Sequence, residues 1–128
     1  EPYAKKYWNG EQELREVLLS SASELKFNPH DGGVYAATQG PRLESVAEVI
    51  KLERDGGDIV GMTGMPEAAL ARELDLKYAA CALVINWAAG KDGDKVISLQ
   101  EMEKYLASGM AKIRTLLETA LPRVVEVE

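Results

Sequence analysis

Three polar side chains that could bind a ligand each stand at the end of a short apolar run. They are the carboxylate of Glu44, in the turn after residues 34–38, the hydroxyl of Thr63, just after residues 58–61, and the carboxamide of Asn86, the last residue of the run 78–86. A carboxylate only accepts hydrogen bonds, whereas a carboxamide both donates and accepts them. Strand ends that converge in an open α/β sheet commonly line a crevice for a small molecule. We therefore predict a small-molecule site where these three runs end.

The spacing of apolar and turn-forming residues predicts which elements hold these groups. Strands are expected at residues 34–38, 58–61 and 78–86, the last as the central strand. Helices are expected at residues 11–26, 44–54, 66–74 and 98–121. Asn9 with Gln12, and Ser98 with Glu101, have capping-box spacing, while Gly56-Gly57 and Pro122 are expected to end helices. The alternation predicts an α/β fold, a parallel-centred sheet flanked by helices.

Three strands are few for a parallel sheet, and its open edge needs a pairing partner. The chain also starts abruptly at Glu1-Pro2-Tyr3. We therefore expect residues 1–128 to be part of a larger unit. The aromatic residues near the start, Tyr3, Tyr7 and Trp8, could anchor a partner surface or pack into a core.

Composition narrows the range of function classes. The net charge of −6 over 128 residues, without basic runs, argues against nucleic-acid binding. No apolar segment is long enough to cross a bilayer, and no Cys/His spacing indicates a metal site. Cys81 is expected to be a buried, inert thiol. His30, the single histidine, could be a general base or a turn residue that bonds nearby backbone. We expect a cytoplasmic protein.

Three motifs together resemble those of trimeric purine nucleoside phosphorylases and methylthioadenosine phosphorylases. They are Gly40-Pro41-Arg42-Leu43-Glu44, Met62-Thr63-x-x-Pro66-Glu67 with Leu70-Ala71-Arg72-Glu73, and Val84-Ile85-Asn86. Within that family, the segments 38–44 and 86–90 look most like the members that act on S-methyl-5′-thioinosine. The resemblance implies a phosphorylase/hydrolase-like fold and a chain that corresponds to the C-terminal half of such an enzyme. The family's glycine-rich phosphate loop and Arg-His pair, which belong to the other half, are not found in it.

The resemblance also implies a role for each polar group. Glu44 would accept from N1–H of a 6-oxopurine, and Asn86 would serve O6 and N7. Met62 would pack on the ribose, and Thr63 would donate to phosphate. Without the resemblance, Met62 could be core, Thr63 a helix cap, Glu44 a helix-terminal charge and Asn86 a strand end.

Four apolar positions bear on substrate choice. Leu43 stands where the family often has a phenylalanine that stacks on the base. Members that accept adenine have aspartates matching Asn86 and Ala88 and a serine matching Glu44. Leu99 and Met102 match apolar positions near a 5′-methylthio group, although they are equally explicable as core.

The function that this resemblance implies is phosphorolysis of S-methyl-5′-thioinosine, or of another 6-oxopurine nucleoside, by a pentosyltransferase. Inorganic phosphate would be the co-substrate, without a cofactor or metal, in a homotrimer that serves purine salvage. A phosphorylase of methylthioadenosine and a non-catalytic purine-binding or regulatory module are the alternatives.

Overall fold

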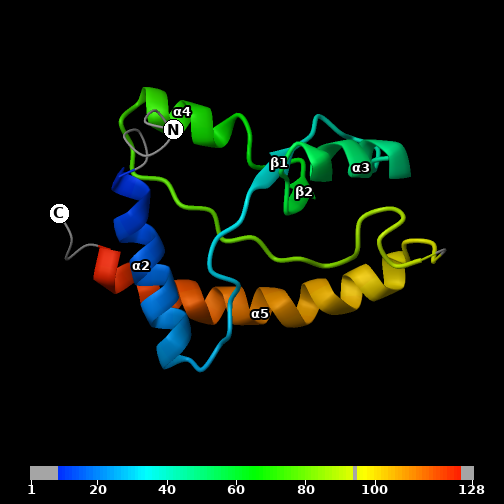
Figure 1. Cartoon of the computed structure of the whole chain (residues 1–128). Coiled ribbons are helices and arrows are strands. Elements are labelled where there is room, and N and C mark those ends of the chain that lie inside the picture. The colour runs from blue at the N-terminus through cyan, green and yellow to red at the C-terminus, as the bar shows by residue number, and fades with distance from the viewer. Residues whose placement is uncertain (1–8, 94, 125–128) are drawn as a thin grey trace. The chain divides into compact units, whose positions relative to one another are not determined.

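A computed structural model of the chain describes residues 9–93 and 95–124, which form two compact units (Figure 1). Within these residues, unit 1 contains residues 9–31, 66–81 and 111–124. Unit 2 contains residues 32–65, 82–93 and 95–110. The three predicted ligand-binding groups, Glu44, Thr63 and Asn86, all belong to unit 2. The aromatic residues of segment 1–8 lie outside the described residues.

Six elements are described along the chain. They are α2 (Asn9–Glu24), β1 (Tyr35–Ala37), α3 (Val46–Arg54), β2 (Ile59–Gly61), α4 (Glu67–Glu73) and α5 (Leu99–Val124). The α/β class and every predicted helix are confirmed, with ends that shift by a few residues. α2 begins at Asn9 rather than at residue 11.

β1 and β2 form a parallel pair in unit 2, as predicted. Tyr35 pairs with Ile59 and Ala37 with Gly61. The pairing extends one residue further, because the N–H of Thr38 donates to the carbonyl oxygen of Gly61 at 2.9 Å. Parallel strands joined through a helix place their carboxyl ends at the same edge. This edge is where residues 38–44 and 62–63 begin.

The third predicted strand, residues 78–86, is wrong: the segment has no strand pairing in the described part of the chain. A strand is defined by its ladder of hydrogen bonds, so apolar residues alone do not make one without a partner edge. Because no strand pairs with this segment in the described part of the chain, Val84 is 65 % exposed. The prediction of a buried Cys81 is also wrong, since its side chain is exposed, although partial burial still raises the pKa of its thiol.

Two helix ends differ from their predictions. Glu44 does not open α3. Ser45 caps the helix instead, in a capping box with Glu48, because its hydroxyl accepts from the Glu48 N–H while the Glu48 carboxylate accepts from the Ser45 N–H. α5 passes through Pro122 and ends two residues later at Val124. The prediction that Pro122 ends the helix is therefore wrong, because the proline removes one backbone N–H without stopping the helix before Val124, the last described residue.

Unit 1 is held by contacts between α2 and the last turns of α5. Ser21 and Ala22 on α2, and Leu116 and Ala120 on α5, are buried. Arg123 donates to Ser21 and pairs with Glu24, so its guanidinium ties the two helices together. Arg123 therefore belongs to α5, beyond residue 121, where the sequence predicts the end of this helix.

Candidate functional site

Glu44 lies in the turn between β1 and α3, half-buried and outside the helix. Its carboxylate accepts a hydrogen bond of 2.6 Å from the hydroxyl of Thr38. Because Thr38 continues the β1–β2 pairing, this bond ties the carboxylate to the edge of the sheet. A carboxylate at this edge can accept from a ring N–H, as the sequence predicts.

The turn that carries Glu44 is fixed by an ion pair. The guanidinium of Arg42 donates to both oxygens of Glu48, at 2.9 and 2.7 Å. Arg42 also donates to the carbonyl oxygen of Leu43 at 3.1 Å. These bonds, with those from Ser45, hold the pKa of Glu48 far below its usual range, and Glu48 in turn raises the pKa of Arg42. The two residues of this ion pair, Arg42 and Glu48, lie before and after Glu44 in the sequence.

Met62 and Thr63 follow β2 at the same edge. Met62 packs on Gly40, where an added Cβ would lie 2.5 Å from the sulfur and would displace the thioether. Gly40 also has φ = +64°, which glycine adopts without strain. The turns after the two strands therefore touch each other, which brings the thioether of Met62 close to the segment that carries Glu44.

Thr63 is exposed and is held by Tyr35. The Thr63 N–H donates to the phenol oxygen of Tyr35 at 3.2 Å, and the two hydroxyl oxygens lie 3.5 Å apart. The Tyr35 ring lies against Gly61 and Gly64, where a side chain would collide with it. The hydroxyl of Thr63 is thus positioned from β1, beside the edge of the sheet.

Asn86 lies in the extended segment without strand pairing and is half-buried. Its amide nitrogen donates to the carbonyl oxygen of Trp87 at 2.7 Å. Four residues on, Gly90 packs against Val46, the first residue of α3. Lys91 pairs with Glu53 of α3 at 2.6 Å. These contacts anchor the segment after Asn86 to the helix that follows Glu44.

The first turns of α5 belong to the same unit. Gly109 packs against Leu83, and the segment that contains Leu83 runs in the opposite direction to α5 (Figure 1). From Leu83 to Asn86 an extended chain advances about 10 Å, and two helical turns from Gly109 back to Met102 span about the same length. Met102 is therefore expected near the level of Asn86.

The predicted apolar positions differ in exposure. Leu99 is 74 % exposed and Leu43 is 50 % exposed, whereas Met102 and Ala88 are half-buried. Met102 and Ala88 thus have some of the burial that a substrate pocket provides, while Leu99 and Leu43 are open to solvent. In the described residues, no hydrogen bond joins Glu44 to Asn86.

Sequence reasoning missed the residues that position the site. Thr38 donates to Glu44, and Tyr35 accepts from Thr63. The ion pair between Arg42 and Glu48 fixes the turn that carries Glu44. A polar residue at the end of an apolar strand run was the available signal for Thr38. His30 is exposed and belongs to unit 1, whereas Glu44 belongs to unit 2.

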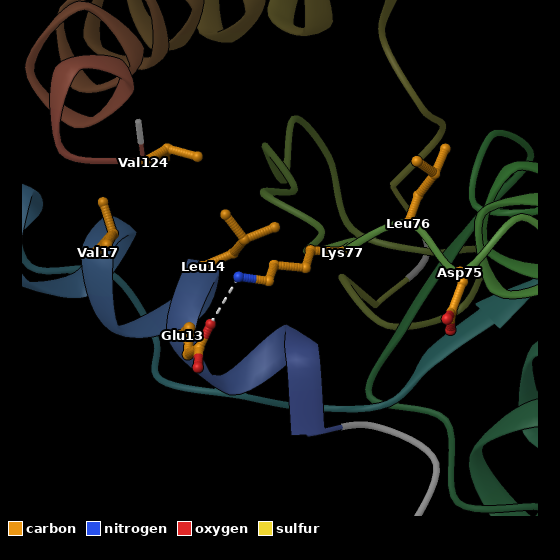
Figure 2. Close-up of a pocket in the computed structure, with 7 residues that line it drawn as sticks. All are labelled: Glu13, Leu14, Val17, Asp75, Leu76, Lys77 and Val124. Carbon is orange, nitrogen blue, oxygen red and sulfur yellow. Dashed lines mark ion pairs between the residues drawn. The ribbon is translucent and has the colours of Figure 1, made fainter. Parts of the chain in front are cut away.

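A separate hollow of about 300 Å³ lies in unit 1 (Figure 2). Its lining is mostly aliphatic, from Leu14, Val17, Leu76 and Val124, and Lys77 pairs with Glu13 across it at 3.0 Å. With its lysine already paired, the hollow offers little to recognise a polar substrate. In the described ranges, no group of three His, Cys, Asp or Glu residues could hold a metal ion, and no helix has both the length and the apolar composition to span a membrane.

A small parallel strand pair with flanking helices defines an α/β protein, and polar side chains stand at the carboxyl edge of the pair. Residues 2–122 match the model of the phosphorylase superfamily, and the chain belongs to that family. This confirms the resemblance that the three sequence motifs indicate.

Individual relatives show which members of the family the chain resembles. The chain is 65 % identical over 108 residues to the probable S-methyl-5′-thioinosine phosphorylase of Pseudomonas syringae pv. tomato, covering 84 % of this chain and 43 % of that protein. It is 45 % identical to the probable 6-oxopurine nucleoside phosphorylase of Thermococcus kodakarensis, covering 85 % and 40 %. The chain thus spans less than half the length of these curated relatives.

Solved structures give the same fold. A schistosoma purine nucleoside phosphorylase in complex with hypoxanthine superposes with a TM-score of 0.78 at 28 % identity, covering 88 % of this chain and 41 % of that one. The methylthioadenosine phosphorylase from Schistosoma mansoni in complex with adenine has a TM-score of 0.77 at 23 % identity, covering 88 % and 45 %. At that identity the second likeness shows the fold alone.

Proposed function

We propose that the chain is the base-binding part of an enzyme that cleaves S-methyl-5′-thioinosine, or another 6-oxopurine nucleoside, with phosphate. The observation that carries the proposal is the joining of three motifs in one unit. Met62 contacts Gly40, and Gly90 contacts Val46. These contacts support a single site that combines Glu44, Met62, Thr63 and Asn86.

The chemistry assigned to the site is phosphorolysis. A phosphate oxygen attacks ribose C1′ and forms the new C1′–O bond. The bond from C1′ to purine N9 breaks with its electron pair on the base, which takes up a proton from solvent at N7. Glu44 accepts from N1–H, and the Asn86 carboxamide, released from Trp87, serves O6 and N7. These contacts stabilise the departing base, while the thioether of Met62 faces the cationic sugar.

The remaining groups to be bound are the co-substrate phosphate and the 5′ end of the nucleoside. The Thr63 hydroxyl, positioned by Tyr35, donates to phosphate, and half-buried Met102 lies beside the 5′-methylthio group, with Leu99, Leu43 and Ala88 around the substrate. The family's glycine-rich loop and Arg-His pair would come from a further segment or a second chain. We extend the proposal to a cytoplasmic homotrimer in purine salvage that uses no cofactor.

The test is the formation of hypoxanthine from S-methyl-5′-thioinosine, with and without phosphate. It is run with residues 1–128 alone and with the protein as its cells produce it, whose intact mass and native mass give any further segment and the assembly. Phosphate-dependent release of base supports the phosphorylase. Release that needs no phosphate would indicate a hydrolase and overturn the proposal. Hypoxanthine binding without product in either preparation would instead support a non-catalytic purine-binding module.

A further inference from the structure

Thr38 connects the sheet to the carboxylate of Glu44. Its N–H donates to the Gly61 carbonyl oxygen at 2.9 Å, so its backbone is fixed by the strand pair. Its hydroxyl donates to one Glu44 oxygen at 2.6 Å. Because threonine is branched at Cβ, χ1 is restricted and the hydroxyl has a defined direction. Glu44 itself lies in a turn, where no ladder or helix bond orients its side chain.

The single hydroxyl proton of Thr38 has two acceptors within reach. The Glu44 carboxylate lies at 2.6 Å, and the Gly61 carbonyl lies at 3.4 Å, near the limit for a hydrogen bond. The shorter bond to a carboxylate is the stronger one. The proton therefore points at Glu44, and that oxygen accepts it. In the described residues, the second Glu44 oxygen accepts no further hydrogen bond, so it is available to a ligand.

We propose that Thr38 is a positioning residue that sets the preference for 6-oxopurines. By donating to one Glu44 oxygen, it fixes the direction of the carboxylate and leaves the other oxygen open as an acceptor. The N1–H of a 6-oxopurine matches that oxygen, whereas adenine N1, itself an acceptor, finds no donor there. Discrimination by an unmatched polar group is typically strong. The inference rests on the proposed function, because it assumes that Glu44 reads the base.

The experiment compares Thr38→Val with Thr38→Ser in the protein as its cells produce it. Valine keeps the shape and removes the hydroxyl, whereas serine restores it. For Thr38→Val we expect kcat/KM for S-methyl-5′-thioinosine to fall about tenfold and that for methylthioadenosine to change little, so the ratio falls about tenfold. Thr38→Ser should keep most of the ratio. Thr115→Val is the matched control, since its hydroxyl donates only to the Ala111 carbonyl within α5.

A second measurement separates positioning from general damage to the fold. In a Glu44→Ala background, Thr38→Val should leave the ratio unchanged, because the hydroxyl has lost its target. An unchanged ratio in Thr38→Val alone, beside an active wild type, would overturn this inference and leave the proposed function standing. Equal losses for both substrates would show that Thr38 is only structural. An inactive wild type would overturn the proposed function and this inference with it.

Discussion

The two predicted base readers, Glu44 and Asn86, differ in how the chain holds them. Glu44 lies between a paired strand and a capped helix, with its carboxylate bonded to Thr38. Asn86 lies in a segment without strand pairing, and its amide donates to the neighbouring Trp87 carbonyl. Glu44 is oriented by a residue of the strand pair, whereas Asn86 makes its hydrogen bond to the next residue along the chain.

This difference shows which part of the site depends on contacts outside the described residues. The elements around Glu44 are complete within unit 2: a strand pair, a capping box and the Arg42–Glu48 ion pair. The segment 78–86 is apolar, and among the described residues no strand ladder fixes its register. We infer that Asn86 reaches its binding geometry only when a ligand or a neighbouring edge replaces its local hydrogen bond.

Removing the Glu44 carboxylate has the largest expected effect. Glu44→Ala should lower kcat/KM for S-methyl-5′-thioinosine about 100-fold, because a hydrogen bond to a charged group is lost in a half-buried site. Steady-state phosphorolysis measures the change. Glu118→Ala, at an exposed position of α5, is the control and should keep wild-type activity. A loss below about threefold would reverse the comparison and make Asn86 the main reader.

Changing Asn86 should alter preference rather than abolish activity. Asn86→Asp replaces a donor with a second acceptor, which suits the 6-amino group of adenine and disfavours O6. We expect the kcat/KM ratio of methylthioinosine to methylthioadenosine to fall about tenfold. Asn28→Asp makes the same change on an exposed loop and should leave the ratio at its wild-type value. If Asn86→Asp leaves it there too, Asn86 does not read the base.

The cap and ion pair beside Glu44 should contribute to stability. Ser45→Ala removes the α3 cap and should lower the free energy of unfolding by about 1 kcal/mol.

The pKa of Glu48 is lower in the folded state than in the unfolded state. The contribution of this carboxylate to folding stability is therefore present at neutral pH and is lost as pH falls below about 4.5. Glu48→Gln should therefore lower Tm at pH 7 and flatten the fall of Tm on acidification. Equal Tm differences from wild type at pH 7 and pH 3.5 would contradict this account.

The helices and the β1–β2 pair were predictable from sequence, whereas the missing pairing of residues 78–86 and the side-chain contacts of Glu44 were not. The apolar runs ending in Thr38 and Gly61, with the glycines after α3, identified a strand–helix–strand unit because each signal acts over a few neighbouring residues. The strand at residues 78–86 could not be judged, since pairing depends on an edge distant in sequence. Glu44 was identified through the motif, but its bond to Thr38 depends on side-chain rotamers that spacing does not reveal.

Removing the Tyr35 hydroxyl has the smallest expected effect. It tests whether the strand pair that positions Glu44 also positions Thr63, the proposed phosphate ligand. Tyr35→Phe leaves the ring on Gly61 and Gly64 but removes the oxygen that meets Thr63. Since Thr63 is exposed, water can replace that oxygen, so we expect the KM for phosphate to rise only about threefold. The preference between the two nucleosides should not change, because Tyr35 does not contact Glu44. Tyr105→Phe, an exposed tyrosine on α5, is the control. A change in base preference with an unchanged KM for phosphate would assign Tyr35 to the base and remove Thr63 from the phosphate site.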